Sequence, residues 1–235
     1  MPMNSLKKLL CSLSRDFVAL VAAVVVALLL IHDVKVYRNV VENGWVETAQ
    51  VVLCGLSGLM AVRVACRGGR GFGRMPLLLA LLFFAMFFRE LDGFLDKLLF
   101  HGAWQCFSVP LGVAFLWQVV RHFRDVCDDA NALLATPTGR LLEIGFLTLL
   151  VFSRVLGMKA IWKPIFDIPL WTDAVAPLYD AAGQLPTDID ILRHVKNAVE
   201  EGVELYGDIL LFLAVMEMTL VASSTLQVQR SKLKG

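Results

Sequence analysis

Long apolar runs alternate with short polar segments along most of the chain. Because the hydrocarbon core of a bilayer is about 30 Å thick, a helix needs about 20 apolar residues to cross it. The runs that reach this length predict six crossings, at about 14–32, 46–66, 75–99, 103–121, 140–161 and 203–224. The pattern therefore predicts an all-α integral membrane protein, a six-transmembrane-helix bundle that forms one polytopic domain over residues 1–235.

The composition favours the same class. Hydrophobic residues make up 57% of the chain and charged residues 18%, whereas soluble domains average about 45–50% and about a quarter. The formal net charge is +1, so no overall positive field favours nucleic acid as a partner. The five cysteines form no CxxC pair and have neither zinc-ribbon nor disulfide-framework spacing, which favours a role as small apolar residues.

Lysine and arginine residues predict the orientation, because they concentrate in the cytoplasmic loops of membrane proteins. Thirteen fall on the side of the N-terminus and seven on the opposite side. We therefore expect both termini in the cytoplasm, the membrane to be a bacterial inner membrane, and the first apolar run to be a retained signal anchor. The one long loop, 163–199, is then periplasmic or extracellular, and its length is typical of a lid or binding element.

Charged residues gather at the predicted outer ends of the second, third, fifth and sixth crossings. Within the third and the sixth they recur at i, i+3 and i+7, which places them on one face of each helix. If these helices are neighbours, the charges share one outward-facing polar pocket. The residues are Glu47, Arg89, Glu90, Asp92, Asp96, Arg154, Glu201, Glu204 and Asp208.

Acids outnumber bases in this predicted pocket, eight to four when the sequence neighbours Lys97, Lys159 and Glu200 are included. An acidic excess at low dielectric must be relieved by protons, cations or water. One interpretation is that some carboxylates have raised pKa values and carry protons. Another is that carboxylate oxygens hold a metal cation.

A purely structural role is the alternative interpretation of the same charges. Charged side chains at membrane depth usually pair with one another, and such pairs tie helices together. The pairs that fit the predicted helix ends are Arg89 with Glu90 or Glu204, and Arg154 with Asp92 or Asp208.

Histidines give a further, weaker signal for a divalent metal ion. His32, His101 and His194 fall near the predicted outer face, and together with a carboxylate such as Asp96 they are suitable zinc ligands. No HExxH-type spacing accompanies them. On the inner side, Glu217 is a candidate relay that would extend a polar path across the bilayer.

The sequence favours cation- or proton-coupled transport or permeation, because it offers many acids but no recognisable nucleophile and no clear metal spacing. Arg89 and Arg154 would set the pKa values of the carboxylates. The ligand-binding residues would be Glu47, Glu90, Asp92, Asp96 and Asp208.

Two other functions stay open. The chain is alternatively an intramembrane hydrolase or transferase, with or without a divalent metal, that acts on a lipid headgroup. Its general base would be Glu201 or Glu204, and Arg89 or Arg154 would bind the phosphate or developing oxyanion. The third hypothesis is a non-catalytic assembly or sensor subunit, whose charges would pair with a second copy or with a membrane partner.

Overall fold

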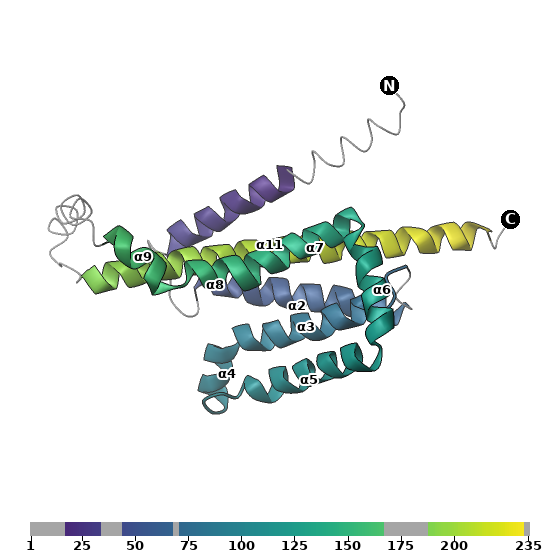
Figure 1. Ribbon diagram of the computed structural model, residues 1–235, viewed down its shortest axis with the longest axis horizontal. Helices are drawn as coiled ribbons and strands as arrows, with labels where there is room; N and C mark the ends of the chain where they lie inside the picture. Colours follow the sequence, from purple (N-terminus) through teal and green to yellow (C-terminus); the bar gives the residue numbers. More distant parts are fainter. Residues whose placement is uncertain (1–16, 34–43, 68–70, 167–187, 233–235) are drawn as a thin grey trace, which may run out of the picture. The chain divides into compact units, whose positions relative to one another are not determined.

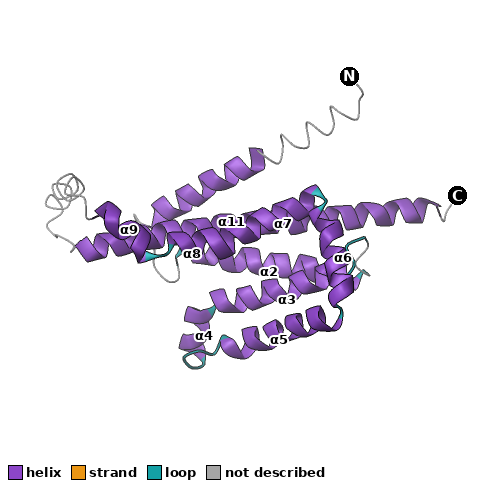
Figure 2. Cartoon of the chain, viewed as in Figure 1, coloured by secondary structure: helices purple, strands orange, loops and turns teal. Residues whose placement is uncertain are grey.

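A computed structural model describes residues 17–33, 44–67, 71–166 and 188–232 of the chain. Within these ranges every regular element is a helix, and no residue lies in a β-strand (Figure 1, Figure 2). The predicted all-α class is therefore confirmed for this part of the chain.

Helices occupy each of the six predicted segments. The first is the helix Phe17–Asp33. The elements that follow are α2 (Trp45–Cys66), α3 (Met75–Glu90), α4 (Asp92–Leu98), α5 (Gln105–Arg121), α6 (Phe123–Leu134), α7 (Pro137–Leu147), the π-helical turn η1 (Thr148–Phe152), α8 (Ser153–Leu156), α9 (Lys159–Phe166) and α11 (Asp188–Lys232).

Two of these helices are long and apolar enough to cross a membrane, namely α2 and the part Val195–Ser223 of α11. The pair α5 and α6 makes a third if the two helices form one bent span. The helix Phe17–Asp33 is apolar but shorter. By length and composition, the described residues therefore contain two or three membrane-spanning candidates.

The predicted third crossing, 75–99, is not one continuous helix. α3 ends at Glu90 and α4 begins at Asp92, and Leu91 between them has φ −89° and ψ 11°. The Asp92 carboxylate accepts a hydrogen bond from the Gly93 N–H at 2.5 Å. Such local bonds compete with the helical pattern, and Asp-Gly is a turn signal.

The predicted outer loop, 163–199, is helical at both described ends, and its place outside the membrane stays a prediction. α9 extends to Phe166 and α11 begins at Asp188, while residues 167–187 lie outside the described part of the chain. The first turns of α11 are rich in charged residues, which lowers hydropathy but does not oppose helix formation. A hydropathy pattern therefore detects only the apolar part of this helix.

The chain divides into two compact units by its internal contacts. The first unit comprises Met1–Val46 and Leu147–Tyr206, and the second comprises Glu47–Phe146 and Gly207–Gly235. The long helix α11 therefore contributes its first part to one unit and the remainder to the other.

In the second unit, α2 and α3 pack closely because glycines face aromatic rings. A Cβ atom on Gly55 would lie 3.1 Å from the ring of Phe87, and one on Gly58 would lie 3.1 Å from the ring of Phe84. Small residues let helix backbones and rings approach in this way in membrane proteins.

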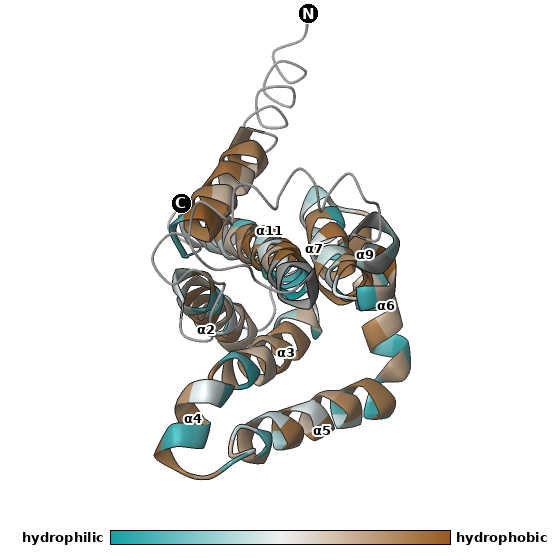
Figure 3. Cartoon of the chain, turned by 90° about the vertical axis from the view of Figure 1, so that its left-hand side faces the viewer, coloured by the Kyte–Doolittle hydropathy of each residue, from teal (hydrophilic) through white to brown (hydrophobic). Residues whose placement is uncertain are grey.

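The helix α5 packs beside α3 in the same unit (Figure 1, Figure 3). The rings of Phe88 and Phe107 stack with centroids 4.8 Å apart. The Ser108 hydroxyl donates to the backbone carbonyl of Ala85 at 2.9 Å. The contact therefore combines apolar packing with one polar bond between the two helices.

In the first unit, the helix Phe17–Asp33 packs against α11, where a Cβ atom on Gly202 would lie 2.6 Å from Leu30. Its last residue, Asp33, is fully buried and accepts hydrogen bonds from the backbone N–H groups of Trp45 at 3.1 Å and Val46 at 3.0 Å. Asp33 thereby caps the start of α2, where backbone N–H groups have no partner within the helix.

A π-helical turn lies inside the helix that covers most of the predicted fifth crossing. The backbone stays helical from α7 through η1 into α8, since Leu147 (φ −62°, ψ −41°) and Ser153 (φ −62°, ψ −43°) on either side of η1 have helical angles. π-turns inside α-helices are rare and are frequent at functional sites. The residues that follow the π-turn are therefore candidates for a functional site.

Candidate functional site

Charged and hydroxyl side chains of α8 and α11 meet in the first unit directly after the π-turn. We call this group the Arg154 cluster, and it consists of Ser153, Arg154, Lys196, Glu200 and Glu204. α8 supplies the first two residues. α11 supplies the other three at i, i+4 and i+8, which places them on one face of that helix.

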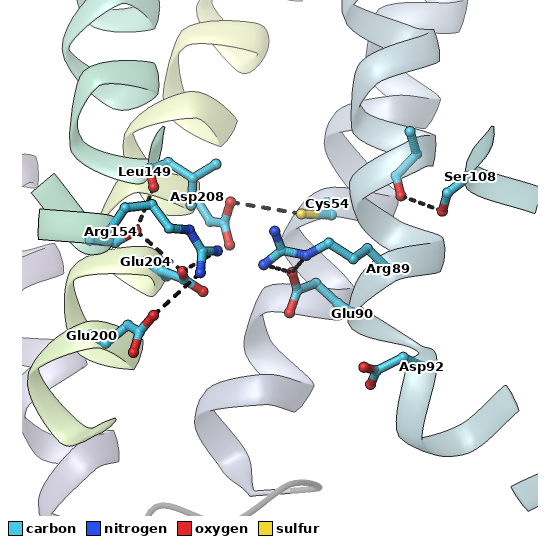
Figure 4. Close-up of polar contacts among 12 residues, drawn as sticks. Cys54, Arg89, Glu90, Asp92, Ser108, Leu149, Arg154, Glu200, Glu204 and Asp208 are labelled. Atoms are coloured by element: carbon cyan, nitrogen blue, oxygen red, sulfur yellow. Dashed lines mark hydrogen bonds and ion pairs between the residues drawn. The ribbon is translucent and has the colours of Figure 1, made fainter. Parts of the chain in front are cut away.

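Arg154 joins two carboxylates that lie one helical turn apart. Its Nη1 lies 3.3 Å from Glu200 Oε1, and its Nη2 lies 2.7 Å from Glu204 Oε1 (Figure 4). Lys196 Nζ adds a second cation at 2.6 Å from Glu200 Oε2. Two acids therefore face two bases, and the contacts are of the strong, charge-assisted kind.

Solvent exposure differs sharply within the cluster. The Glu204 side chain is 6% exposed, whereas that of Arg154 is 48% exposed. Gly157, which follows α8, leaves space for the Glu200 side chain, because a Cβ atom at position 157 would lie 2.6 Å from the Glu200 carboxylate. The cluster therefore reaches from the surface at Arg154 to a nearly buried carboxylate at Glu204.

The Ser153 hydroxyl has two acceptors within reach and one hydrogen to donate. The residue is fully buried, and its Oγ lies 2.5 Å from the carbonyl oxygen of Leu149 and 3.2 Å from Glu204 Oε1. When Glu204 is ionised, the hydroxyl can donate to only one of these oxygens at a time. When Glu204 carries a proton, it can donate to Ser153, and Ser153 can donate to Leu149. The direction of the Ser153 O–H bond is therefore coupled to the proton on Glu204.

The second unit carries two further polar contacts. Arg89 folds onto its sequence neighbour, with Nη2 3.0 Å and Nε 3.2 Å from Glu90 Oε1 (Figure 4). The Cys54 thiol donates to Asp208 Oδ1 at 3.8 Å, and both residues are buried. The charges of Arg89, Glu90 and Asp208 all act electrostatically on Cys54, which places them around one position of α2.

The predicted common face of Arg89, Asp92 and Asp96 was wrong, because the helix is interrupted at Leu91. Asp92 bonds the adjacent Gly93 N–H. Asp96 Oδ2 lies 2.7 Å from His101 Nδ1, and its other oxygen accepts from the Gly102 N–H at 2.8 Å. Asp96 therefore fixes the turn between α4 and α5.

Glu47 and Glu201 are placed on helices but not in the Arg154 cluster. Glu47 lies in the first turn of α2, and Glu201 lies in α11 next to Glu200; both are half-buried. One pocket shared by all of the predicted charges stays a prediction.

The predicted metal site has no ligand set in the described part of the chain, where no three His, Cys, Asp or Glu side chains are grouped to hold an ion. His32 Nδ1 lies 3.7 Å from Asp33 Oδ1, and its ring packs edge-on against Trp45 with centroids 6.0 Å apart. The side chain of His194 lies outside the described residues. A histidine-liganded metal therefore stays a prediction.

Three small residues that complete these contacts were not predicted from the sequence, namely Ser153, Cys54 and Thr138. Thr138 donates to Oε2 of the predicted inner relay Glu217 at 2.8 Å. Cys54 lies in an apolar stretch of α2, Ser153 directly precedes Arg154, and Thr138 lies in the polar start of α7. No motif in the sequence marks them.

Comparison with protein families, curated proteins and solved structures found no match for this chain. Function is therefore inferred from the geometry of the site.

Proposed function

We propose that the chain is an integral membrane protein that passes protons, or else a small cation, across the bilayer, and that Glu204 is its central exchanging group. The observation that carries the proposal is the shared hydroxyl of Ser153. Glu204 lies 2.7 Å from Arg154 and 3.2 Å from a buried hydroxyl that also reaches a backbone carbonyl. This arrangement offers hydrogen bonds to both the ionised and the protonated carboxyl, which proton exchange requires.

The charge balance of the Arg154 cluster favours protons over divalent cations. Two carboxylates face two bases, so the cluster offers a metal ion no formal excess of negative charge. A Ca²⁺ ion takes about six to eight oxygen ligands, whereas a proton needs one acceptor oxygen. Ionisable groups inside membrane proteins commonly serve proton relays.

The proposal includes six crossings with both termini in the cytoplasm of a bacterial inner membrane. The uninterrupted helical backbone from α7 to α8 supports the fifth crossing, because its residues 137–156 extend over roughly 30 Å at 1.5 Å per residue. A fluorescent reporter that folds only in the cytoplasm, fused after Gly235, should be bright. A dark fusion that is nevertheless present in the membrane fraction would overturn the orientation.

Proton flux is tested with purified protein in liposomes that contain a pH-sensitive dye. Under an imposed potential, wild type should acidify or alkalinise the lumen faster than empty liposomes, and Glu204→Gln should reduce the rate at least tenfold. Glu143→Gln is the matched control, because Glu143 is an exposed carboxylate of α7 outside the cluster. Wild-type flux equal to that of empty liposomes under proton, sodium and potassium gradients would exclude the proposal.

A lipid-headgroup enzyme is the second candidate, and the half-exposed side chain of Arg154 favours it. A guanidinium at the surface is suited to bind a phosphate, and Glu204 beside it would serve as general base. Incubation with labelled phospholipid vesicles distinguishes the two functions. Headgroup turnover that Arg154→Lys weakens, without proton flux, would favour the enzyme.

A further inference from the structure

The helix α6 is amphipathic and lies outside the proposed proton site. Apolar residues recur at i, i+3, i+4, i+7 and i+11 as Phe123, Val126, Cys127, Ala130 and Leu134, which places them on one face. The opposite face is polar and carries Arg124, Asp125, Asp128, Asp129 and Asn131. In Figure 3, α5 is mostly brown, whereas α6 is banded brown and teal.

Two aspartates on the polar face of α6 bind the residue that precedes α3 in the second unit. Asp129 Oδ2 accepts the backbone N–H of Arg74 at 2.8 Å, and Asp125 Oδ2 lies 3.4 Å from Arg74 Nε. Gly73 makes room for this contact, since a Cβ atom there would lie within 2.1 Å of the Asp129 carboxylate. Two of the three aspartates of α6 are thereby engaged by the start of α3.

The apolar face of α6 is exposed at both ends and half-buried at Val126, Cys127 and Ala130 between them. Phe123 is 62% exposed and Leu134 is 42% exposed, and Leu133 at the edge of this face is the buried residue of the helix. In a soluble protein the apolar side of such a helix would face the core. Contact with lipid or with another apolar surface would bury the apolar face of α6.

The angle between α5 and α6 identifies that partner. The two helices are bent by 97° at His122 (Figure 1). α5 has no buried residue and exposes a stripe of Val109, Val113, Leu116, Trp117 and Val120. If α5 crosses the bilayer, as the proposed topology has it, a helix at about a right angle to it runs parallel to the membrane plane.

We infer that α6 is an interfacial helix that binds the surface of the same bilayer, with its apolar face at the boundary between headgroups and acyl chains. Arg121 and Arg124 at the bend face the headgroup layer, where basic residues are attracted to anionic lipid. The inference rests on the membrane-spanning part of the proposed function, and not on proton transport.

Spin-label accessibility tests this inference on the full-length chain in phosphatidylcholine vesicles with a minor fraction of phosphatidylglycerol. Cys11, Cys54, Cys66 and Cys106 are replaced by Ala, so that Cys127 alone carries the nitroxide. In the matched control the label moves one residue, by Cys127→Ala and Asp128→Cys. The ratio of oxygen to nickel-chelate accessibility should be several-fold higher at position 127 than at 128.

Two further labels make the result decisive. Leu134→Cys, on the same face as Cys127, should reproduce the high ratio, which guards against a local distortion at one site. Val113→Cys in α5 should give a ratio above both, because it lies deeper in the bilayer. A low ratio at Val113 would refute the crossing itself, and with it the premise of the proposed function.

Three results would overturn the interfacial helix while leaving α5 in the membrane. Equal nickel accessibility at 127 and 128 would place α6 in water. Low accessibility of 127 to both reagents would place a second copy or another protein on the apolar face. Ratios at 127 and 128 that both equal the ratio at Val113 would make α5 and α6 one broken span.

Discussion

Arg154 and Arg89 are the two arginines of the predicted outward-facing pocket, and their contacts in the structure differ. Their side chains are almost equally exposed, at 48% and 46%. Arg154 in the first unit binds two carboxylates of α11 that are 46 and 50 residues further along the chain. Arg89 in the second unit binds Glu90, its immediate sequence neighbour.

The difference shows that exposure and residue type do not decide the role of an arginine. The contact between Arg89 and Glu90 joins neighbours on one helix, and an ion pair with a half-exposed partner contributes about 0–1 kcal/mol. A guanidinium that bridges two carboxylates of another helix fixes that helix and keeps a nearly buried carboxylate neutralised. The Arg154 cluster therefore combines structural and functional roles, whereas the contact between Arg89 and Glu90 does not itself join two helices.

Removal of each arginine should give the largest contrast between the two regions. Arg154→Met should lower the free energy of unfolding by about 2–3 kcal/mol, less than the 3–5 of a fully buried pair because Arg154 is half-exposed. Arg89→Met should cost less, because the contact of Arg89 with Glu90 contributes about 0–1 kcal/mol. Equilibrium unfolding in detergent measures both, and equal losses would contradict the distinction.

Two buried serines, Ser153 in the first unit and Ser57 in the second, allow the two regions to be compared by the removal of one hydroxyl group from each. Ser153→Ala should cost about 1–2 kcal/mol, because Glu204 and Leu149 lose a buried hydrogen-bonding group. Ser57→Ala in α2 should be neutral or stabilising, because the equally buried Ser57 hydroxyl has no hydrogen-bond partner among the described residues. The same unfolding measurement applies, and a larger loss at Ser57 would count against the assigned contacts.

Two glycines give the smallest expected effects, of opposite sign. Gly157→Ala should cost about 0.5–1 kcal/mol, because the methyl group displaces the Glu200 carboxylate from Arg154 and Lys196. Gly93→Ala in α4 should stabilise by about 0.5–1 kcal/mol, because no atom lies within 4 Å of its Cβ position and alanine favours the helix. Thermal midpoints that shift in the same direction for both variants would refute the local environments described.

The helices within the predicted crossings were predictable because each contains a long apolar run, whereas α6 and the start of α11 have no such run and were not predicted. The pairing of Arg89 with Glu90 was one of the structural pairs considered, and the structure confirms it. The break at Leu91 was missed because the apolar pattern continues past it, although Asp-Gly at the next positions is a turn signal. The Asp92 carboxylate accepts the Gly93 N–H in the first turn of α4, directly after this break.

The composition of the Arg154 cluster was only partly predictable. Arg154 and Glu204 were both expected in a polar site, but Lys196 was assigned to a loop because the start of α11 is not apolar. Ser153 carries no motif, and the π-turn before it is a property of the hydrogen-bond pattern, which no residue type specifies. Long-range partners follow from helix packing, which a hydropathy pattern does not encode.

The capping of α2 by Asp33 has a consequence for biosynthesis. The carboxylate and the two N–H groups that it binds are separated by only 12 and 13 residues, so all three emerge from the ribosome almost together. The start of α2 can therefore be secured against the end of the preceding helix before any residue of the Arg154 cluster has been translated. The bonds of Asp33 to the start of α2 would then be among the first long-range polar contacts that the nascent chain can form.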